Sequence, residues 1–212
     1  MSVLKKLAGQ TAIYGLSSIV GRFLNYLVVP LHTTVFLPQQ YGVITEMYAY
    51  VAFLIILLTY GMETAYFRFS SKQDHNPNTI FSTVLSSLIG STALFIVMAI
   101  IFAQPIAEWL LYPNNKEYVV WFGIIVGLDA ISSIPLARLR TENKAKTFAT
   151  INIVNVLVYL GLNFFFLSYC FPLVSEGGGN WLTDTFYDPA TGVGYVFIAN
   201  LIASVVKFLL LS

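Results

Sequence analysis

Long apolar stretches separated by short polar connections make up most of the chain. About 20 mainly apolar residues cross the hydrocarbon core of a bilayer as a helix, and each stretch is about that long. Six spans are expected, at residues 11–36, 44–68, 80–104, 118–137, 148–171 and 193–211. No stretch alternates with period two for long enough to predict a transmembrane barrel. The pattern therefore predicts an all-α, polytopic membrane helix bundle.

The composition agrees with this class. Hydrophobic residues make up 57% of the chain and charged residues only 10%, with a mean hydropathy of +0.75. A soluble domain carries about 25% charged residues. The single cysteine, Cys170, rules out an internal disulfide. Lys5 and Lys6 before an apolar run imitate a signal peptide, but the run is too long and contains Arg22, so we predict an uncleaved first span.

The positive charges are distributed unevenly between the two sides of the predicted bundle. Lys116 lies on the side opposite the amino terminus, and Arg22 and Lys207 lie inside spans. The remaining lysines and arginines fall on the side of the amino terminus: Lys5, Lys6, Arg68, Lys72, Arg138, Arg140, Lys144 and Lys146. By the positive-inside rule, both termini are expected to be cytoplasmic.

Arg22 lies near the middle of the first expected span. A helix of about 26 residues is roughly 39 Å long, so Arg22 is at least about 16 Å from either end. A charged side chain at the centre of a membrane helix costs several kcal/mol on insertion. Such residues are retained where they face a partner or water. Polar residues recur around it every three or four positions, in the stripe Tyr14, Ser18, Arg22, Asn25, Val29 and His32. We interpret Arg22 as a cavity-facing functional residue; the alternative is a buried structural ion pair.

Similar stripes follow other spans. The second carries Glu46, Tyr50, Phe53, Leu57, Tyr60, Thr64 and Phe67; the fifth carries Asn152, Asn155, Tyr159, Asn163, Phe166 and Cys170; and the sixth carries Tyr195, Asn200, Ser204 and Lys207. The third span has only a ladder of small residues, and Gly123 and Gly127 in the fourth have the spacing of a packing motif. We expect the first, second, fifth and sixth spans to line a hydrated cavity, with the third outside it.

Two acids inside spans, Asp129 and Glu63, need partners. Counting from the cytoplasmic ends places Arg22 at about 16 Å, Asp129 at about 12 Å, and Glu63 and Lys207 at about 8 Å. Arg22 with Asp129 and Lys207 with Glu63 are therefore depth-matched candidate pairs, although depth alone leaves the pairing open. These pairs are either structural or part of a cavity in which cations bind an anionic group and acids take up a proton or cation. The candidate substrate-binding residues are Arg22, Asn25, Lys207 and Asn155, and the candidate ion-coupling residues are Asp129 and Glu63.

The sequence contains no catalytic constellation. His32 and His75 are far apart, no glycine-rich loop follows a strand, and no residues have metal-ligand spacing. We expect no enzymatic activity, no cofactor, no metal and no nucleic-acid partner. Any transport would not be driven by ATP hydrolysis in this chain.

Three segments resemble one family of membrane proteins. They are Q-T-A-I-Y-G-L-S-S-I-V-G-R-F-L-N at residues 10–25, P-Q-Q-Y-G at 38–42 and G-M-E-T-A-Y-F-R-F at 61–69. They look like bacterial polysaccharide flippases, the oligosaccharide-lipid transporters of the multidrug/oligosaccharidyl-lipid/polysaccharide superfamily. Members have two lobes of six or more helices that face each other across a cavity. The resemblance implies that residues 1–212 are the amino-terminal lobe and that a carboxy-terminal lobe is missing, and we expect the chain to be a fragment.

The resemblance also implies a function. It is the export of a lipid-linked oligosaccharide, similar to undecaprenyl-diphosphate carrying sugars, across the bacterial cytoplasmic (inner) membrane by alternating access. The driving force would be a coupling ion, proton or sodium, and the product would serve cell-surface polysaccharide such as lipopolysaccharide. Arg22 and Lys207 suit a diphosphate ligand. The alternatives are a cation-coupled multidrug efflux antiporter, in which Asp129 and Glu63 would dominate, and a non-transporting membrane scaffold in the lipid bilayer.

Overall fold

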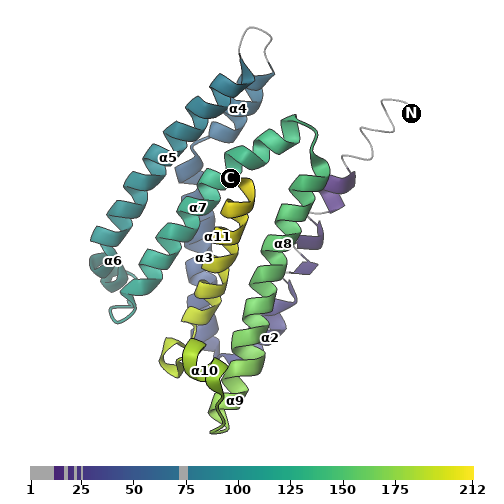
Figure 1. Cartoon of the computed structure of the whole chain (residues 1–212). Helices are drawn as coiled ribbons and strands as arrows, with labels where there is room; N and C mark the ends of the chain where they lie inside the picture. The colour runs from purple at the N-terminus through teal and green to yellow at the C-terminus, as the bar shows by residue number, and fades with distance from the viewer. Residues whose placement is uncertain (1–11, 17–18, 22, 25, 72–75) are drawn as a thin grey trace.

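The computed structural model describes residues 12–16, 19–21, 23–24, 26–71 and 76–212, and every element in this part of the chain is helical (Figure 1). The helices are α2 Val28–Val35, α3 Pro38–Thr59, α4 Met62–Ser70, α5 Pro77–Ile101, α6 Ala103–Trp109, α7 Lys116–Thr141, α8 Ala145–Asn163, a π-helix Phe164–Cys170, α9 Phe171–Ser175, α10 Trp181–Phe186, a 3₁₀ turn Pro189–Thr191 and α11 Gly194–Leu211. The predicted all-α polytopic bundle is confirmed.

Five helical segments of the described residues are long and apolar enough to cross a membrane. They are Pro38–Thr59, Pro77–Ile101, Lys116–Thr141, Ala145–Ser175 and Gly194–Leu211. These segments confirm the second to sixth expected spans as membrane-length helices. The first expected span, 11–36, includes residues outside the described part, and α2 forms its carboxy-terminal portion.

The boundaries of the second expected span, 44–68, are wrong at both ends. The helix α3 starts earlier because Pro38 occupies its first position and the Leu37 N–H donates to Gln40 Oε1 at 3.0 Å. It also ends earlier, because Tyr60 and Gly61 both adopt left-handed backbone conformations, with φ of 31° and 76°. The chain then restarts as the separate helix α4.

Two other expected spans are interrupted or extended. The third, 80–104, stops at Ile101, and α6 follows as a separate short helix after Phe102. The fifth, 148–171, continues through the π-helix into α9. These changes lie at or beyond the end of the bundle that is opposite the basic connections (Figure 1).

The helix α7 is the centre of the bundle. It packs against α5 on one side and against α11 on the other, with α8 beyond α11 (Figure 1). The α5–α7 contact is close because Gly123 and Gly127 leave room for it: a Cβ on Gly123 would meet Ala99 Cβ at 2.9 Å, and one on Gly127 would meet Ile96 Cδ1 at 2.7 Å. The glycine spacing therefore serves packing within the chain, as predicted. On the other side, the buried Phe197 ring of α11 lies 4.6 Å from that of Phe122.

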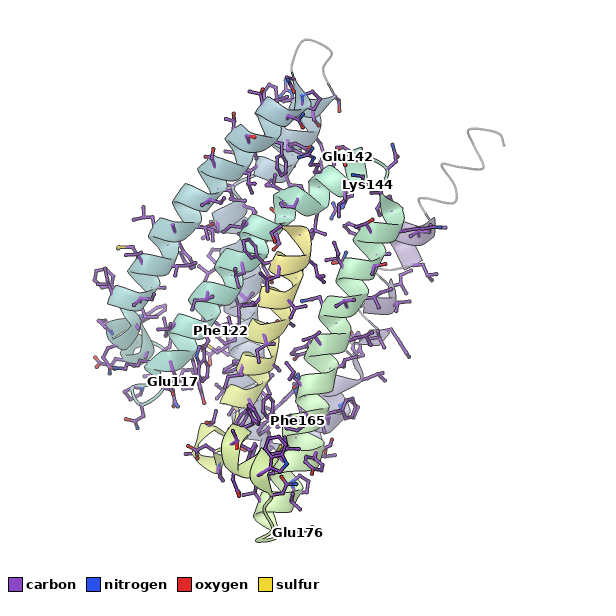
Figure 2. All side chains as sticks on the ribbon, in the orientation of Figure 1. Glu117, Phe122, Glu142, Lys144, Phe165 and Glu176 are labelled. Atoms are coloured by element: carbon purple, nitrogen blue, oxygen red, sulfur yellow. The ribbon has the colours of Figure 1, made fainter. Side chains whose placement is uncertain are left out.

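Among the described residues, basic side chains outnumber acidic ones at the end of the bundle that carries the α7–α8 turn, and acidic side chains outnumber basic ones at the opposite end. Glu142 and Lys144 lie in the α7–α8 turn at one end, whereas Glu117 and Glu176 lie at the other (Figure 2). The basic segments that the sequence predicted to share a side do so where they are described. Which end faces the cytoplasm stays a prediction from the charge bias.

Candidate functional site

A polar cavity of about 400 Å³ lies between α2, α3, α8 and α11. Its described lining consists of Val28, Val29, His32, Tyr41, Ile44, Thr45, Tyr48, Asn155, Val156, Tyr159 and Asn200. These four helices belong to the first, second, fifth and sixth expected spans, and α5 contributes nothing to the described lining. The set of helices agrees with the prediction, but the stripe predicted on the second span is wrong: its Tyr50 and Phe53 line a separate apolar groove, and Tyr41, Thr45 and Tyr48 face the cavity instead. The hydration of the cavity stays a prediction.

A charged pair lies one to two turns from the cavity along α11. Asn200, Ser204 and Lys207 share one face of this helix because they are spaced by four and three residues. Ser204 Oγ donates to Asp129 Oδ1 at 3.0 Å, and Lys207 Nζ donates to the same oxygen at 2.6 Å. The Lys207 and Asp129 side chains are only 12% and 22% exposed. The mostly enclosed pair therefore joins α7 to α11 beside the polar cavity.

This geometry corrects the depth-matched pairing of Lys207 with Glu63. Glu63 instead accepts a hydrogen bond from Arg140 Nη1 at 2.6 Å, and the two side chains are 37% and 40% exposed. The depth count assumed one continuous helix, whereas the break at Gly61 redirects α4 toward the carboxy-terminal end of α7. Glu63 thus belongs to the basic end of the bundle and not to its interior.

Arg22 and Asn25 lie outside the described residues. Their assignment as substrate-binding residues, and the suggested pairing of Arg22 with Asp129, stay predictions. Asn155, by contrast, is placed on the cavity wall, and its Nδ2 donates to the backbone oxygen of Ala203 at 2.8 Å. Of the predicted site residues, the structure brings together Lys207 and Asp129 and sets Asn155 in the neighbouring cavity.

A buried pair that the sequence analysis missed closes one side of the cavity. His32 Nε2 lies 2.8 Å from Asn163 Oδ1, and the two residues are 4% and 1% exposed. The Nδ2 of Asn163 donates to the backbone oxygen of Tyr159 at 2.8 Å, so its Oδ1 faces the imidazole. In the neutral ring, Nε2–H is therefore the donor of the His32–Asn163 bond. Both residues stood in polar stripes of their spans, but nothing in the stripes indicated that the two would meet.

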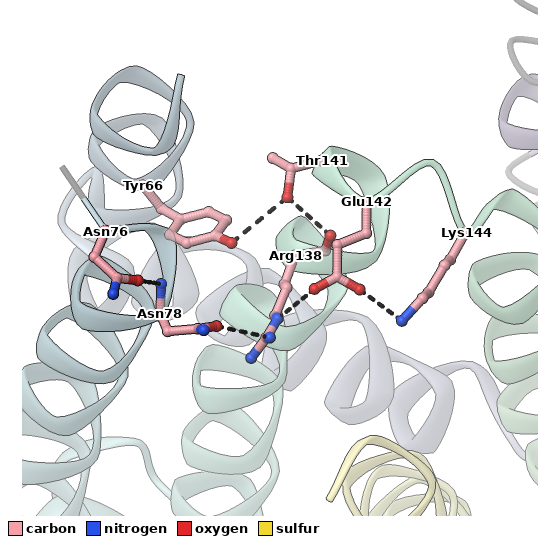
Figure 3. Close-up of polar contacts among 7 residues, drawn as sticks. All are labelled: Tyr66, Asn76, Asn78, Arg138, Thr141, Glu142 and Lys144. Carbon is pink, nitrogen blue, oxygen red and sulfur yellow. Dashed lines mark hydrogen bonds and ion pairs between the residues drawn. The ribbon is translucent and has the colours of Figure 1, made fainter. Parts of the chain in front are cut away.

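A second polar cluster ties three helices together at the basic end (Figure 3). Arg138 donates from Nε to Glu142 Oε1 at 2.6 Å and from Nη2 to Asn78 Oδ1 at 3.1 Å. Lys144 Nζ lies 2.6 Å from Glu142 Oε2. The hydrogen bond from Lys144, followed by that from Arg138, lowers the pKa of the Glu142 carboxyl from its ordinary value. The cluster fastens the start of α5 and the approach to α8 onto the end of α7.

An apolar groove of about 720 Å³ lies between α3, α5, α6 and α7. Its lining is almost entirely apolar: Met47, Tyr50, Val51, Phe53, Leu54, Phe95, Met98, Ala99, Phe102, Pro105, Ile106, Trp109, Leu110, Val119, Phe122 and Gly123. At its edge, Glu46 accepts hydrogen bonds from the hydroxyls of Tyr50 at 3.0 Å and Tyr112 at 2.6 Å. Burial, and then the bond to Glu46, raises the pKa of Tyr112 to about 12.

The sequence match agrees with this membrane architecture. The family model for polysaccharide biosynthesis proteins matches residues 35–172, from the end of α2 to the start of α9. The chain belongs to the polysaccharide biosynthesis protein family. No curated protein and no solved structure was found to match it. Membership of this family, together with five described helices of membrane-spanning length, indicates a polysaccharide-related transport role.

The polysaccharide biosynthesis family member offers no metal centre in its described part. No group of three or more His, Cys, Asp or Glu side chains lies close enough there to hold an ion. The described site offers hydrogen-bonding side chains in the cavity and an ion pair between Lys207 and Asp129.

Proposed function

We propose that this chain forms the amino-terminal lobe of a flippase for a lipid-linked oligosaccharide of the undecaprenyl-diphosphate type. The transporter would work in the bacterial inner membrane by alternating access with ion coupling, with both termini cytoplasmic. The single observation that carries the proposal is the neutral polar cavity beside a mostly enclosed lysine–aspartate pair, in a membrane bundle of the polysaccharide biosynthesis family. A second lobe, suggested by the sequence resemblance, would close the cavity from the other side.

In this proposal the substrate diphosphate competes with Asp129 for Lys207. Both ligands offer oxygen acceptors to the same ammonium group, so binding of the diphosphate releases Asp129 from its 2.6 Å bond. A carboxylate enclosed without a cation is unfavourable, so the released Asp129 takes up a proton or sodium ion. Substrate and coupling ion are then linked through one lysine. Arg22 and Asn25 are proposed to assist at the diphosphate and Asn155 at the attached sugar.

Glu63 has a different place in the proposal. Its ion pair with Arg140 lies at the basic end, with both side chains more than one-third exposed. We propose it as a second ion-coupling residue that acts where the substrate enters, and not within the cavity.

A non-transporting scaffold is the second candidate, because a paired Lys207 and Asp129 is also what a structural bridge between α7 and α11 requires. The two candidates differ in what happens when the pair is removed as a unit. A scaffold tolerates the loss of both charges, whereas a flippase of the proposed kind loses its substrate and ion sites together.

The test measures glycan export and detergent stability for the natural protein carrying Lys207→Gln, Asp129→Asn or both. We expect export to fall at least tenfold in all three, with the double variant as stable as the parent. Lys144→Gln, at the basic end, is the matched control and keeps export. Normal export by a stable double variant would contradict the flippase mechanism and favour the scaffold.

Arg22 provides an independent arm of this test. Arg22→Ala is expected to abolish export without reducing membrane insertion, since a central arginine costs about 2.5–3.5 kcal/mol on insertion scales. Arg22→Lys keeps the charge but loses the bidentate fork, so partial export is expected. Full export by Arg22→Ala would remove Arg22 from the proposed diphosphate site.

A further inference from the structure

The polar cavity differs in chemistry from both the apolar groove and the charged pair. None of its described lining residues carries a formal charge at neutral pH with His32 neutral. Tyrosine, asparagine, threonine and histidine side chains supply its polar groups, and valine and isoleucine fill the space between them. A ligand that matches this wall is uncharged, rich in hydrogen-bonding groups and partly apolar.

The wall presents donors and acceptors together. The orientation of the Asn163 amide makes Nε2–H of neutral His32 the donor of their bond, which leaves Nδ1 as an acceptor. The hydroxyls of Tyr48 and Tyr159 are 3.5 Å apart, beyond the 2.5–3.0 Å of a well-formed O–H···O bond. A ligand hydroxyl to one side of the pair could bond to both at a shorter distance than the one that separates them. Phosphate oxygens only accept and hydrocarbon does neither, whereas sugar hydroxyls donate and accept.

The position of the cavity relative to Lys207 fits a sugar attached to a diphosphate. Asn200 lines the cavity and lies seven residues before Lys207 on the same face of α11. Seven residues of α-helix rise about 10 Å. A diphosphate attached to a sugar ring beside Asn200 would have to extend about this distance along α11 to meet the Lys207–Asp129 pair.

We propose that this cavity is a subsite for an uncharged sugar ring and that it rejects acidic sugars, an inference that rests on the proposed function. The aromatic faces of Tyr41, Tyr48 and Tyr159 contact the ring, and their hydroxyls, with the amides of Asn155 and Asn200, bond to its substituents. A sugar carboxylate would be enclosed without a cationic partner among the described lining residues, and Arg22 is assigned to the diphosphate in the proposed function, so an acidic sugar is unfavourable here. The diphosphate binds outside this subsite.

The experiment measures binding of four synthetic probes to the purified chain in a detergent without a sugar headgroup. The probes are farnesyl diphosphate, the same lipid diphosphate carrying N-acetylglucosamine, the same carrying glucuronic acid, and farnesyl N-acetylglucosaminide without phosphate. The neutral sugar is expected to improve the affinity of the diphosphate probe about tenfold, the effect of one or two good hydrogen bonds. Glucuronic acid is expected to bring no improvement.

Variants locate the effect. Tyr159→Phe and Asn200→Leu should reduce the tenfold gain to less than about threefold, while the affinity for farnesyl diphosphate stays unchanged. Tyr50→Phe is the matched control, because Tyr50 lies on α3 but lines the apolar groove, and it should keep the full gain. Lys207→Gln should weaken the three diphosphate probes and leave the phosphate-free glycoside unaffected.

The outcomes separate this inference from the function on which it rests. Equal affinity with and without the neutral sugar, or an unchanged gain in Tyr159→Phe and Asn200→Leu, would overturn the subsite. Glucuronic acid binding as tightly as N-acetylglucosamine would overturn the charge selectivity. Diphosphate binding that does not depend on Lys207 would contradict the proposed function, while sugar-dependent binding of the glycoside would still support the subsite.

Discussion

The polar cavity and the apolar groove share one wall, the helix α3, and differ in almost everything else. Tyr41, Thr45 and Tyr48 face the cavity, whereas Met47, Tyr50 and Leu54 face the groove. The two sets lie on different faces because positions three and four apart share a face and adjacent positions do not. A single helix thus separates a surface suited to a hydrated sugar from one suited to hydrocarbon.

The two regions are also held together by different interactions. Around the cavity, hydrogen bonds and one ion pair join α2, α7, α8 and α11 through His32–Asn163, Asn155–Ala203 and Lys207–Asp129. On the groove side, α5 and α7 are joined by close packing at two glycines. Polar partners can be exchanged for a ligand, but glycine packing cannot. Close packing at glycines joins α5 to α7 on the groove side, which we call the packed half, whereas polar contacts join the helices of the cavity half.

Breaking the ion pair on the cavity side should have the largest effect. Asp129→Ala leaves the Lys207 ammonium mostly enclosed without a partner, and we expect a loss of about 3 kcal/mol in unfolding free energy. Thermal unfolding in detergent measures it. Lys207→Met in the same chain should restore most of the stability, because the double variant has no uncompensated charge.

The exposed pair at the basic end is the matched control for that cycle. Glu63→Ala removes a partner of Arg140 whose side chain is 40% exposed, so water can solvate the charge that remains. We expect Glu63→Ala to lower the unfolding free energy by less than about 1 kcal/mol. Equal losses for Asp129→Ala and Glu63→Ala would show that the interior pair is as solvated as the surface pair.

Overpacking the contact between α5 and α7, on the groove side, should have the next largest effect on stability. A methyl at Gly123 would meet Ala99 Cβ at 2.9 Å, and neither atom can rotate away because both are fixed to helix backbones. Gly123→Ala is therefore expected to separate α5 from α7 and to destabilise the bundle by about 2 kcal/mol. Gly90→Ala on α5 is the control, since nothing lies within 4 Å of the position that its methyl would take and it should be neutral or stabilising. An unchanged melting temperature in Gly123→Ala would show that close packing at Gly123 does not stabilise the groove side of the bundle.

Removing the buried amide on the cavity side should have a somewhat smaller effect. Asn163→Leu keeps the branched shape of the side chain but leaves the His32 Nε2–H without its acceptor, at a cost of about 1–2 kcal/mol. The melting temperature and the binding of the neutral sugar probe should both fall. Asn152→Leu is the control, since the Asn152 amide bonds only within its own helix, to the Phe148 oxygen at 3.0 Å, as far as the described contacts show. The same loss in both variants would mean that the His32–Asn163 bond adds nothing.

The fold class and the cavity-forming helices could be predicted from sequence because they depend on periodic patterns. Apolar length alone locates a span. The stripes of the fifth and sixth spans included the cavity residues Asn155 and Asn200, but the stripe of the second span included Tyr50 and Phe53, which face the apolar groove. The break at Tyr60–Gly61 could not be predicted this way, because hydropathy is insensitive to a left-handed backbone. That missed break is also why Glu63 was expected in the interior.

Pairing between helices was the least predictable part of the site. Depth along a span is one coordinate, whereas contact also requires neighbouring helices and matching faces. Lys207 therefore met Asp129 although Glu63 was closer to it in estimated depth. Asn163 and His32 each stood in a polar stripe, but only the packing of α2 against the π-helix region brings them together.

The smallest effect is expected at the Arg138–Glu142–Lys144 cluster, which connects the groove side to the cavity side. Glu142 receives hydrogen bonds from Arg138, which also bonds to Asn78 on α5, and from Lys144 at the approach to α8. These bonds lower the pKa of Glu142 below its ordinary value of 4.5. A lowered pKa in the folded state stabilises the protein above the ordinary value. That stabilisation is lost as the pH falls through 4.5 toward the folded pKa.

Glu142→Gln should therefore be slightly less stable than the parent at pH 7, by less than about 1 kcal/mol because the cluster is partly exposed to water. The difference should shrink as the pH falls below 4.5, where the parent loses the same ion pairs. Unfolding midpoints in denaturant at several pH values measure it. Glu176→Gln, in the exposed turn at the opposite end, is the control and should be as stable as the parent at pH 7 (Figure 2). If the difference in stability between Glu142→Gln and the parent stayed constant at every pH, the charge of Glu142 would not contribute to it. The groove side and the cavity side would then be joined at this point by packing and not by ion pairs.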